Sequence, residues 1–294
     1  MLYGPPIWRE EEEFRHSGWR PRRQIIMAAM TRCCLPTARQ ERFARCGANC
    51  WIERSPCTDR VRVRANFCHD RWCQPCANAR SLVIAENLRQ ALTDEPHRHV
   101  VLTLRHSPIP LAKQVDRLYS CFRRLRSSRL WGESTAGGAV FLEVKIGRDG
   151  AWHPHLHVVS QGQYIPQSAL SAEWLSITGD SDNVWIELIR DGEKLRRYIT
   201  KYASKPLEPG IVNDLVKLDE LIRALHGRRL CSTFGSWRGI ALEGRLEDAD
   251  DWQPVCQLID LVRAKAAGEP WAVALWLRLR PWEVEENNKG PPKP

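Results

Sequence analysis

The chain has 294 residues, 43% of them hydrophobic, which is enough for one large domain or two small ones with a hydrophobic core. It carries 44 Lys and Arg against 35 Asp and Glu, and the resulting net charge of +9 favours a polyanionic partner. No apolar run approaches the roughly 18 residues that a membrane span needs and no signal peptide is recognised, so we expect a cytoplasmic protein without membrane attachment that keeps its cysteines reduced.

The N-terminal part combines an irregular segment with a cysteine-rich one. Residues 1–41 are highly charged, and we expect a poorly ordered extension with a short helix around residues 24–30. Residues 42–80 hold six of the 11 cysteines and are predicted to form a small zinc module. A helix is predicted over residues 79–92, because apolar side chains recur on one side of it.

The spacing of these cysteines is typical of a structural Zn²⁺ site. Cys68, Cys73 and Cys76 form a Cys-x4-Cys-x2-Cys segment, and further cysteines lie about twenty residues upstream. A structural zinc site takes four ligands, mostly cysteine thiolates. The candidates for the fourth ligand are Cys46, Cys50, Cys57 and His69. The alternative interpretation is a group of reduced cysteines without a metal.

Residues 81–206 are predicted to form one α+β domain. The sequence pattern predicts strands at 99–105, 140–146, 152–160 and 184–189, and helices at 111–125, 168–177 and 192–204. An Asp-Gly step after residue 148 indicates that the second and third strands form an antiparallel hairpin. We therefore expect an antiparallel sheet with flanking helices, followed by a mainly helical region at 207–286 and a disordered tail at 287–294.

Two histidines in the third predicted strand are candidate metal ligands. His155 and His157 are two residues apart, so on a strand they project from the same face and can bind one ion. The hairpin nominates Glu143, on the preceding strand, as a third ligand. Two histidines and one carboxylate suit a divalent ion and leave positions open for a phosphate oxygen. The alternative is a structural or surface histidine pair beside a solvated carboxylate.

Two tyrosines in the last predicted helix of the domain are candidate nucleophiles. Tyr198 and Tyr202 are four residues apart, as are Lys201 and Lys205, so each pair lies on one face of a helix. A phenol with a pKa of about 10 needs nearby cations or a metal to attack a phosphate at neutral pH. These lysines supply positive charge that holds phosphates and lowers the phenol pKa. The alternative is that both tyrosines pack in the core.

Three segments taken in order resemble the motifs of rolling-circle replication initiators, which belong to the HUH endonuclease superfamily. They are the strand at 99–105, the His-Pro-His-Leu-His sequence at 153–157 and the Tyr-Ile-Thr-Lys-Tyr-Ala-Ser-Lys sequence at 198–205. The resemblance extends over about residues 42–240, including the sequences at 67–76 and 233–237. It implies a palm-like endonuclease domain at 81–206 and an upstream cysteine module, in which a Cys-Gly step favours Cys46 as the fourth ligand.

The resemblance also implies a chemistry for each motif. In that family the histidine pair binds Mg²⁺ or Mn²⁺, and a tyrosine attacks the origin strand to leave a 5′-phosphotyrosine and a free 3′-OH. Single-tyrosine relatives carry the nucleophile directly after the motif lysine, which corresponds to Tyr202. Some relatives have a glutamate at the position of Tyr198, whereas the two-tyrosine form resembles phage replication proteins and two-tyrosine transposases.

We therefore predict a DNA endonuclease and strand transferase that initiates rolling-circle replication. Its expected partners are single-stranded or hairpin origin DNA, a host DNA polymerase and a host helicase, since the chain has no P-loop motif of its own. The oligomeric state stays open. The alternatives are a two-tyrosine single-strand transposase and a zinc-dependent DNA-binding regulator without enzymatic activity.

Further basic and aromatic residues are candidates for DNA contacts. Four arginines lie near the end of the helix predicted at 111–125, namely Arg123, Arg124, Arg126 and Arg129. We expect them to make salt-sensitive phosphate contacts, the alternative being a solvated helix face. The 13 tryptophans include candidates for stacking on unpaired bases, which the sequence does not separate from core residues.

Overall fold

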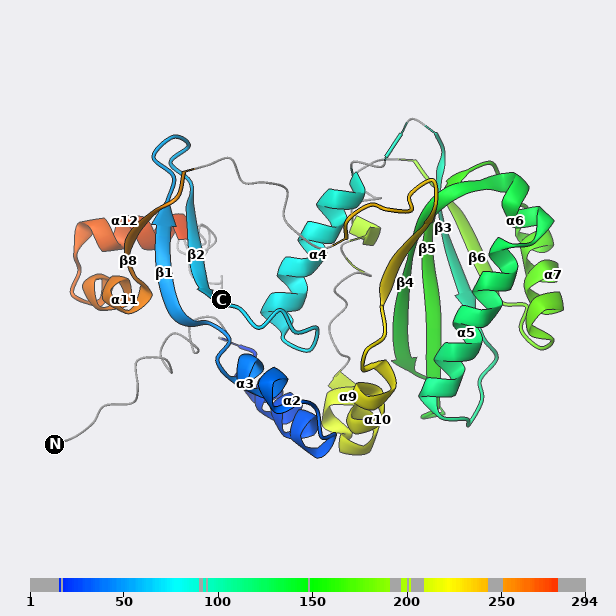
Figure 1. Cartoon of the computed structure of the whole chain (residues 1–294), viewed down its shortest axis with the longest axis horizontal. Coiled ribbons are helices and arrows are strands. Elements are labelled where there is room, and N and C mark those ends of the chain that lie inside the picture. The colour runs from blue at the N-terminus through cyan, green and yellow to red at the C-terminus, as the bar shows by residue number, and fades with distance from the viewer. Residues whose placement is uncertain are drawn as a thin grey trace, which may run out of the picture. The chain divides into compact units, whose positions relative to one another are not determined.

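The computed structural model describes residues 16, 18–89, 92–93, 95–147, 149–190, 197–199, 201, 209–242 and 251–279. The chain divides into two units, each assembled from segments that are distant in the sequence (Figure 1). The first unit comprises residues 1–23, 36–70 and 247–294, and the second comprises residues 24–35 and 71–246. The tail predicted at 287–294 lies outside the described residues.

The first unit is built on a three-stranded antiparallel sheet in the order β2-β1-β8. Its elements are β1 (Ala48–Arg54), β2 (Val61–Asn66), β8 (Gln253–Gln257), α11 (Leu258–Ala266) and α12 (Pro270–Leu279). Buried side chains of β1 and the two helices form its core, among them Ile52, Leu261 and Trp276. The sequence predicts mainly helices after residue 207, and β8 is a strand within that region.

The described part of the N-terminal segment, residue 16 and residues from 18 onward, is mainly helical, whereas the sequence predicts a largely irregular extension. α2 (Arg20–Arg32) extends the short helix expected around residues 24–30, and α3 (Thr37–Ala44) is an additional helix. Ile26, Ala29 and Met30 of α2 are buried. Tertiary packing therefore stabilises α2, which has no strong amphipathic pattern by which the sequence could reveal its full length.

The second unit is built on a five-stranded antiparallel sheet in the order β6-β3-β5-β4-β7. Its strands are β3 (His97–Thr103), β4 (Thr135–Ile146), β5 (Trp152–Gly162), β6 (Val184–Ile189) and β7 (Cys231–Gly235). The first four lie within a few residues of the predicted strands, whereas β7 is a strand that the sequence did not indicate. The predicted α+β class with an antiparallel sheet and flanking helices is confirmed.

The hairpin of β4 and β5 sets the position of the candidate metal ligands. Glu143 lies directly opposite His155, and Phe141 lies directly opposite His157. In an antiparallel pair, directly opposite residues project from the same face of the sheet. Gly150 in the connecting turn has a φ of +76°, a left-handed conformation that glycine adopts without steric cost. The Asp-Gly step therefore predicts the turn, whereas the register is set by the loop that Gly147 closes by donating to the Ala151 carbonyl over 2.8 Å.

Helices cover both faces of this sheet (Figure 1). α5 (Leu111–Arg126), α6 (Arg129–Ser134) and α7 (Gln167–Thr178) lie on one side, and α4 (Gln74–Arg89) lies on the other. On the side of α4, Ile84, Ala85 and Leu88 pack against Phe141 and Val159, which share a sheet face with His157. α9 (Pro209–Asn213) and α10 (Leu215–Leu225) complete the unit, and α10 packs against α5.

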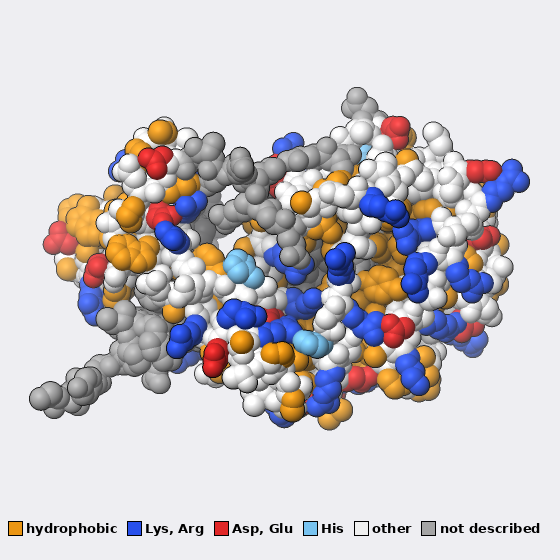
Figure 2. Space-filling model, in the orientation of Figure 1, with side chains coloured by type: hydrophobic (Ala, Val, Ile, Leu, Met, Phe, Trp, Pro, Cys, Tyr) orange, Lys and Arg blue, Asp and Glu red, His pale blue; other side chains and the backbone are white. Residues whose placement is uncertain are grey.

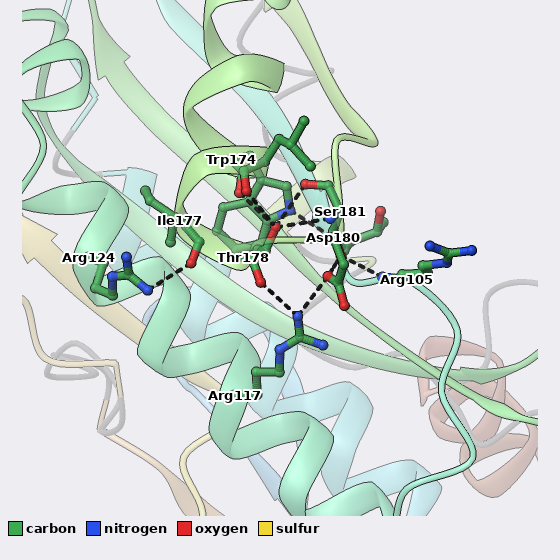
Figure 3. Close-up of polar contacts among 10 residues, drawn as sticks. Arg105, Arg117, Arg124, Trp174, Ile177, Thr178, Asp180 and Ser181 are labelled. Atoms are coloured by element: carbon green, nitrogen blue, oxygen red, sulfur yellow. Dashed lines mark hydrogen bonds and ion pairs between the residues drawn. The ribbon is translucent and has the colours of Figure 1, made fainter.

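A polar network joins α5 to the end of α7 (Figure 3). Arg124 donates to the Ile177 carbonyl over 2.7 Å, and Arg117 donates to the Thr178 carbonyl over 3.0 Å and to Asp180 over 2.7 Å. These guanidinium groups satisfy carbonyls at the C-terminus of α7 that have no partner within the helix. Two of the arginines of α5 therefore have a structural role.

No helix in the described part of the chain is both long enough and apolar enough to cross a lipid bilayer.

Candidate functional site

The three predicted metal ligands meet on one face of the five-stranded sheet. One ligand atom from each of Glu143, His155 and His157 lies within 4.8 Å of the others. His157 Nε2 lies 2.6 Å from Glu143 Oε2, and both side chains are buried. His155 Nε2 is also buried and has no hydrogen-bond partner among the described residues. A buried imidazole nitrogen without a partner, beside a histidine and a carboxylate, fits a divalent metal ion.

The environment keeps the imidazoles of this cluster neutral. Burial lowers the pKa of His155 and of His157 to about 3, with His153 and Lys145 respectively as the next causes. Burial and the neighbouring His157 lower the pKa of His99 to about 4. All three rings are therefore neutral near pH 7, which is the form in which imidazole binds a metal.

A line of polar contacts runs from His157 away from the cluster. His157 Nδ1 lies 3.1 Å from His99 Nε2, and His99 Nδ1 lies 3.5 Å from Glu187 Oε1. If His157 Nε2 offers its lone pair to a metal, Nδ1 carries the proton and donates a hydrogen bond to His99 Nε2. The proton of His99 then lies on Nδ1, the atom that is 3.5 Å from the Glu187 carboxylate. His99 and Glu187 thus orient His157. Neither residue was predicted as part of the site, although Glu187 is the single carboxylate within the apolar strand at 184–189.

Tyr198 contacts the same line of residues. Its ring stacks on His99 with centroids 4.4 Å apart, and its hydroxyl donates a hydrogen bond to Glu187 Oε1. Lys201 is exposed, and its charge contributes to lowering the pKa values of His99 and His157. The structure therefore brings Tyr198 and Lys201 to the histidine cluster. Tyr202 and Lys205 lie outside the described residues.

Four cysteines of the predicted zinc module come together. The Sγ atoms of Cys46, Cys68, Cys73 and Cys76 lie within 4.8 Å of one another, and all four residues are buried. Of the alternative ligands, Cys50 packs in the core of the first unit and Cys57 is exposed. Four thiolates are the ligand set of many structural zinc sites. The described cysteines are all reduced.

The four arginines near the end of α5 have different surroundings. Arg124 is bound to the end of α7, and Arg129 pairs with Glu133 at 2.7 Å. Arg123 and Arg126 instead line an open groove of about 750 Å³ beside β4 and β7, and neither has a carboxylate partner within the described ranges. Figure 2 shows Lys and Arg side chains gathered over this region. Arg123 and Arg126 are therefore the two with charge available for an anion.

Comparison with known proteins identifies the family. The model of a family described as "Replication protein" matches residues 59–276. The chain belongs to this family. The match includes both strands of the hairpin of β4 and β5, the tyrosine segment and three of the four grouped cysteines, Cys46 lying upstream of it. No curated protein and no solved structure matches the chain. Membership of the replication protein family confirms the predicted resemblance to rolling-circle replication initiators.

Proposed function

We propose that this replication protein starts rolling-circle replication by nicking one strand of its origin and later rejoins that strand. The observation that carries the proposal is the cluster of Glu143, His155 and His157, side chains of the kind that bind divalent metals, in which the buried Nε2 of His155 has no hydrogen-bond partner among the described residues. Its position beside the tyrosine segment of a replication protein supports nuclease chemistry. The protein is proposed to act in the cytoplasm with a host helicase and DNA polymerase.

Glu143, His155 and His157 would hold Mg²⁺ or Mn²⁺. Such an ion, when bound, withdraws charge from a phosphate oxygen and so makes the phosphorus a better electrophile. The cysteine group at Cys46, Cys68, Cys73 and Cys76 would hold a structural Zn²⁺. Carboxylate and imidazole suit the first ion and thiolates suit the second, so the two sites are expected to select different metals.

The nucleophile in this proposal is Tyr202. Its phenol oxygen bonds to the phosphorus, the bond to the 3′ oxygen breaks, the phenol loses its proton and the 3′ oxygen gains one. Lys201 and Lys205 would bind the flanking phosphates. Tyr198 would carry out the second transfer, which ends the cycle, and Glu187, which accepts a hydrogen bond from the Tyr198 hydroxyl, would take its proton. Each transfer exchanges one phosphodiester for another, so rejoining needs no energy source.

The test is incubation of the protein with labelled single-stranded DNA from its own replicon and Mn²⁺, followed by a denaturing gel and mass spectrometry of the adduct. Replacing both His155 and His157 with Ala should abolish nicking and leave duplex binding largely intact. Tyr202→Phe should remove nearly all initial nicking, whereas Tyr198→Phe should nick but fail to complete the second transfer. An adduct on Tyr198 alone would reverse the roles, and an adduct on neither tyrosine would refute the mechanism.

The same experiment separates the alternatives. A zinc-dependent regulator forms no covalent adduct under any of these conditions. A two-tyrosine transposase forms the adduct but requires the ends of a mobile element rather than a replication origin, so competition between these two DNAs decides between the enzymes.

A further inference from the structure

The structure distinguishes buried tryptophans from exposed ones, which the sequence alone does not do. In the second unit, five described tryptophans are buried, namely Trp72, Trp131, Trp152, Trp174 and Trp237. Trp185 is different, because 54% of its surface is exposed. It lies on the edge strand β6. Burial in the fold therefore accounts for the five other tryptophans but not for Trp185.

The strand register places Trp185 on the face of the sheet that carries the metal ligands. Val101 of β3 lies opposite His157 on one side and opposite Trp185 on the other. These three residues therefore form one row across neighbouring strands and project from the same face. Since adjacent strands are about 4.8 Å apart, the backbones of His157 and Trp185 are separated by about 10 Å.

Exposure increases along β6 toward Trp185 on this face. Ile189 is buried in the cluster that includes Phe141, Glu187 is half-buried against His99, and Trp185 is exposed. Leu188 of the same strand is also exposed, but it projects from the opposite face because side chains alternate along a strand. The exposed ring of Trp185 is too small a surface for a protein partner but sufficient for one planar ring.

The charges near this face suit a nucleic-acid strand. Lys145 lies 3.6 Å from Glu143, and Lys201 and Arg197 are exposed on the tyrosine segment. A cationic surface with an exposed aromatic ring is the usual combination in proteins that bind single strands, because every base has a face that can stack.

We propose that Trp185 stacks on an unpaired base of the DNA strand that is bound at Glu143, His155 and His157. This proposal rests on the proposed function, since it assumes that a single strand occupies this face. Stacking would hold the strand against the sheet beside the scissile phosphate and would favour melted DNA over duplex DNA. Trp185 is accordingly a positioning residue for the strand.

The test compares the full-length protein and its variants for binding to three probes without divalent metal, so that no nicking is required. The probes are (dT)20, a 20-nucleotide oligomer with abasic sites throughout, and a 20-base-pair duplex. Trp185→Ala should weaken binding of (dT)20 by about five- to 150-fold. Binding of the abasic oligomer should change little, because its phosphates remain and its bases are missing.

The matched control is Leu188→Ala, which removes a similarly exposed apolar side chain from the other face of the same strand. It should leave binding of all three probes unchanged.

Trp185→Phe keeps a ring and should retain part of the preference for (dT)20 over the abasic oligomer. Thermal melting shows whether each variant is folded. Equal affinity of Trp185→Ala and wild type for (dT)20, or an equal loss for (dT)20 and the abasic oligomer, overturns the proposal. A protein that binds as expected but never nicks would refute the proposed function alone.

Discussion

At the scale of single residues, Glu187 connects two parts of the site. Its carboxylate contacts both His99 and the hydroxyl of Tyr198, and His99 contacts His157. A carboxylate at the end of such a line favours one tautomer of each ring before it, in which the lone pair of His157 Nε2 would be left for a metal ion held together with Glu143. The residue therefore influences a metal it would not touch.

We expect Glu187→Gln to weaken Mn²⁺ binding by about 10- to 100-fold, because a neutral amide accepts less strongly from His99 and no longer fixes its tautomer. Titration calorimetry or the electron paramagnetic resonance signal of free Mn²⁺ measures the affinity. The control is Glu133→Gln, which changes an exposed glutamate on α6 in the same way. Unchanged affinity in Glu187→Gln would show that His157 is oriented by other contacts.

The lowered histidine pKa values predict how stability depends on pH in the metal-free protein. The pKa values of His155 and His157 are about 3 in the folded state, against 6.5 ordinarily. As the pH falls below 6.5 the unfolded chain takes up protons that the folded protein does not, so the free energy of unfolding decreases toward pH 4. Thermal melting between pH 7.5 and 4.5 should show this decrease. It should be smaller when both residues are Gln, and identical decreases would contradict the assignment.

At the scale of elements, α5 carries arginines with two different roles. Arg117 and Arg124 bind the end of α7, whereas Arg123 and Arg126 face the groove beside β4 and β7. The guanidinium of Arg126 lies 5.1 Å from the ring centroid of Phe122 and 5.5 Å from that of Phe234. Both rings are buried, so this groove offers charge rather than stacking. It suits phosphates in either single or double strands.

Replacing Arg123 and Arg126 with Ala should weaken binding of duplex DNA. It should also reduce the slope of log K against log salt by about 1.8, because two fewer counterions are released. Fluorescence anisotropy at several salt concentrations measures this slope. Arg129→Ala is the matched control, since Arg129 already pairs with Glu133. An unchanged slope in the double variant would mean that the groove does not contact DNA.

Local patterns predicted the central elements of the sheet well. The hairpin of β4 and β5 follows from two apolar runs and an Asp-Gly turn, and it brings Glu143 to the histidine strand as expected. The exact pairing of Glu143 with His155 depends on the length of the loop, which the Asp-Gly step does not fix. β7 and β8 were missed, since each has five residues and is defined by a partner strand far away in the sequence. For the same reason the contacts among His99, Glu187 and Tyr198 were not predictable, because three separate segments supply them.

At the scale of the whole molecule, the cysteine group is expected to support folding. Chelation, or replacing Cys73 and Cys76 with Ser, should release bound zinc and lower the melting temperature, because a structural metal contributes its binding free energy to folding. Metal analysis and thermal melting of protein purified without chelator check this. The matched control is Cys57→Ser, which changes an exposed cysteine outside the group. Protein that contains no zinc and melts unchanged would refute the prediction.

The pairing of β1 with β8 has a consequence for synthesis on the ribosome. β1 ends at Arg54 and β8 begins at Gln253, and the two helices that complete the core of the first unit follow β8. At 5–20 residues per second, the ribosome needs about 10 to 40 s to make the intervening chain. During that time β1 has β2 as its partner but exposes its other edge, and an open edge can pair with other chains. Nascent or prematurely terminated chains are therefore expected to depend on chaperones that bind unpaired strands.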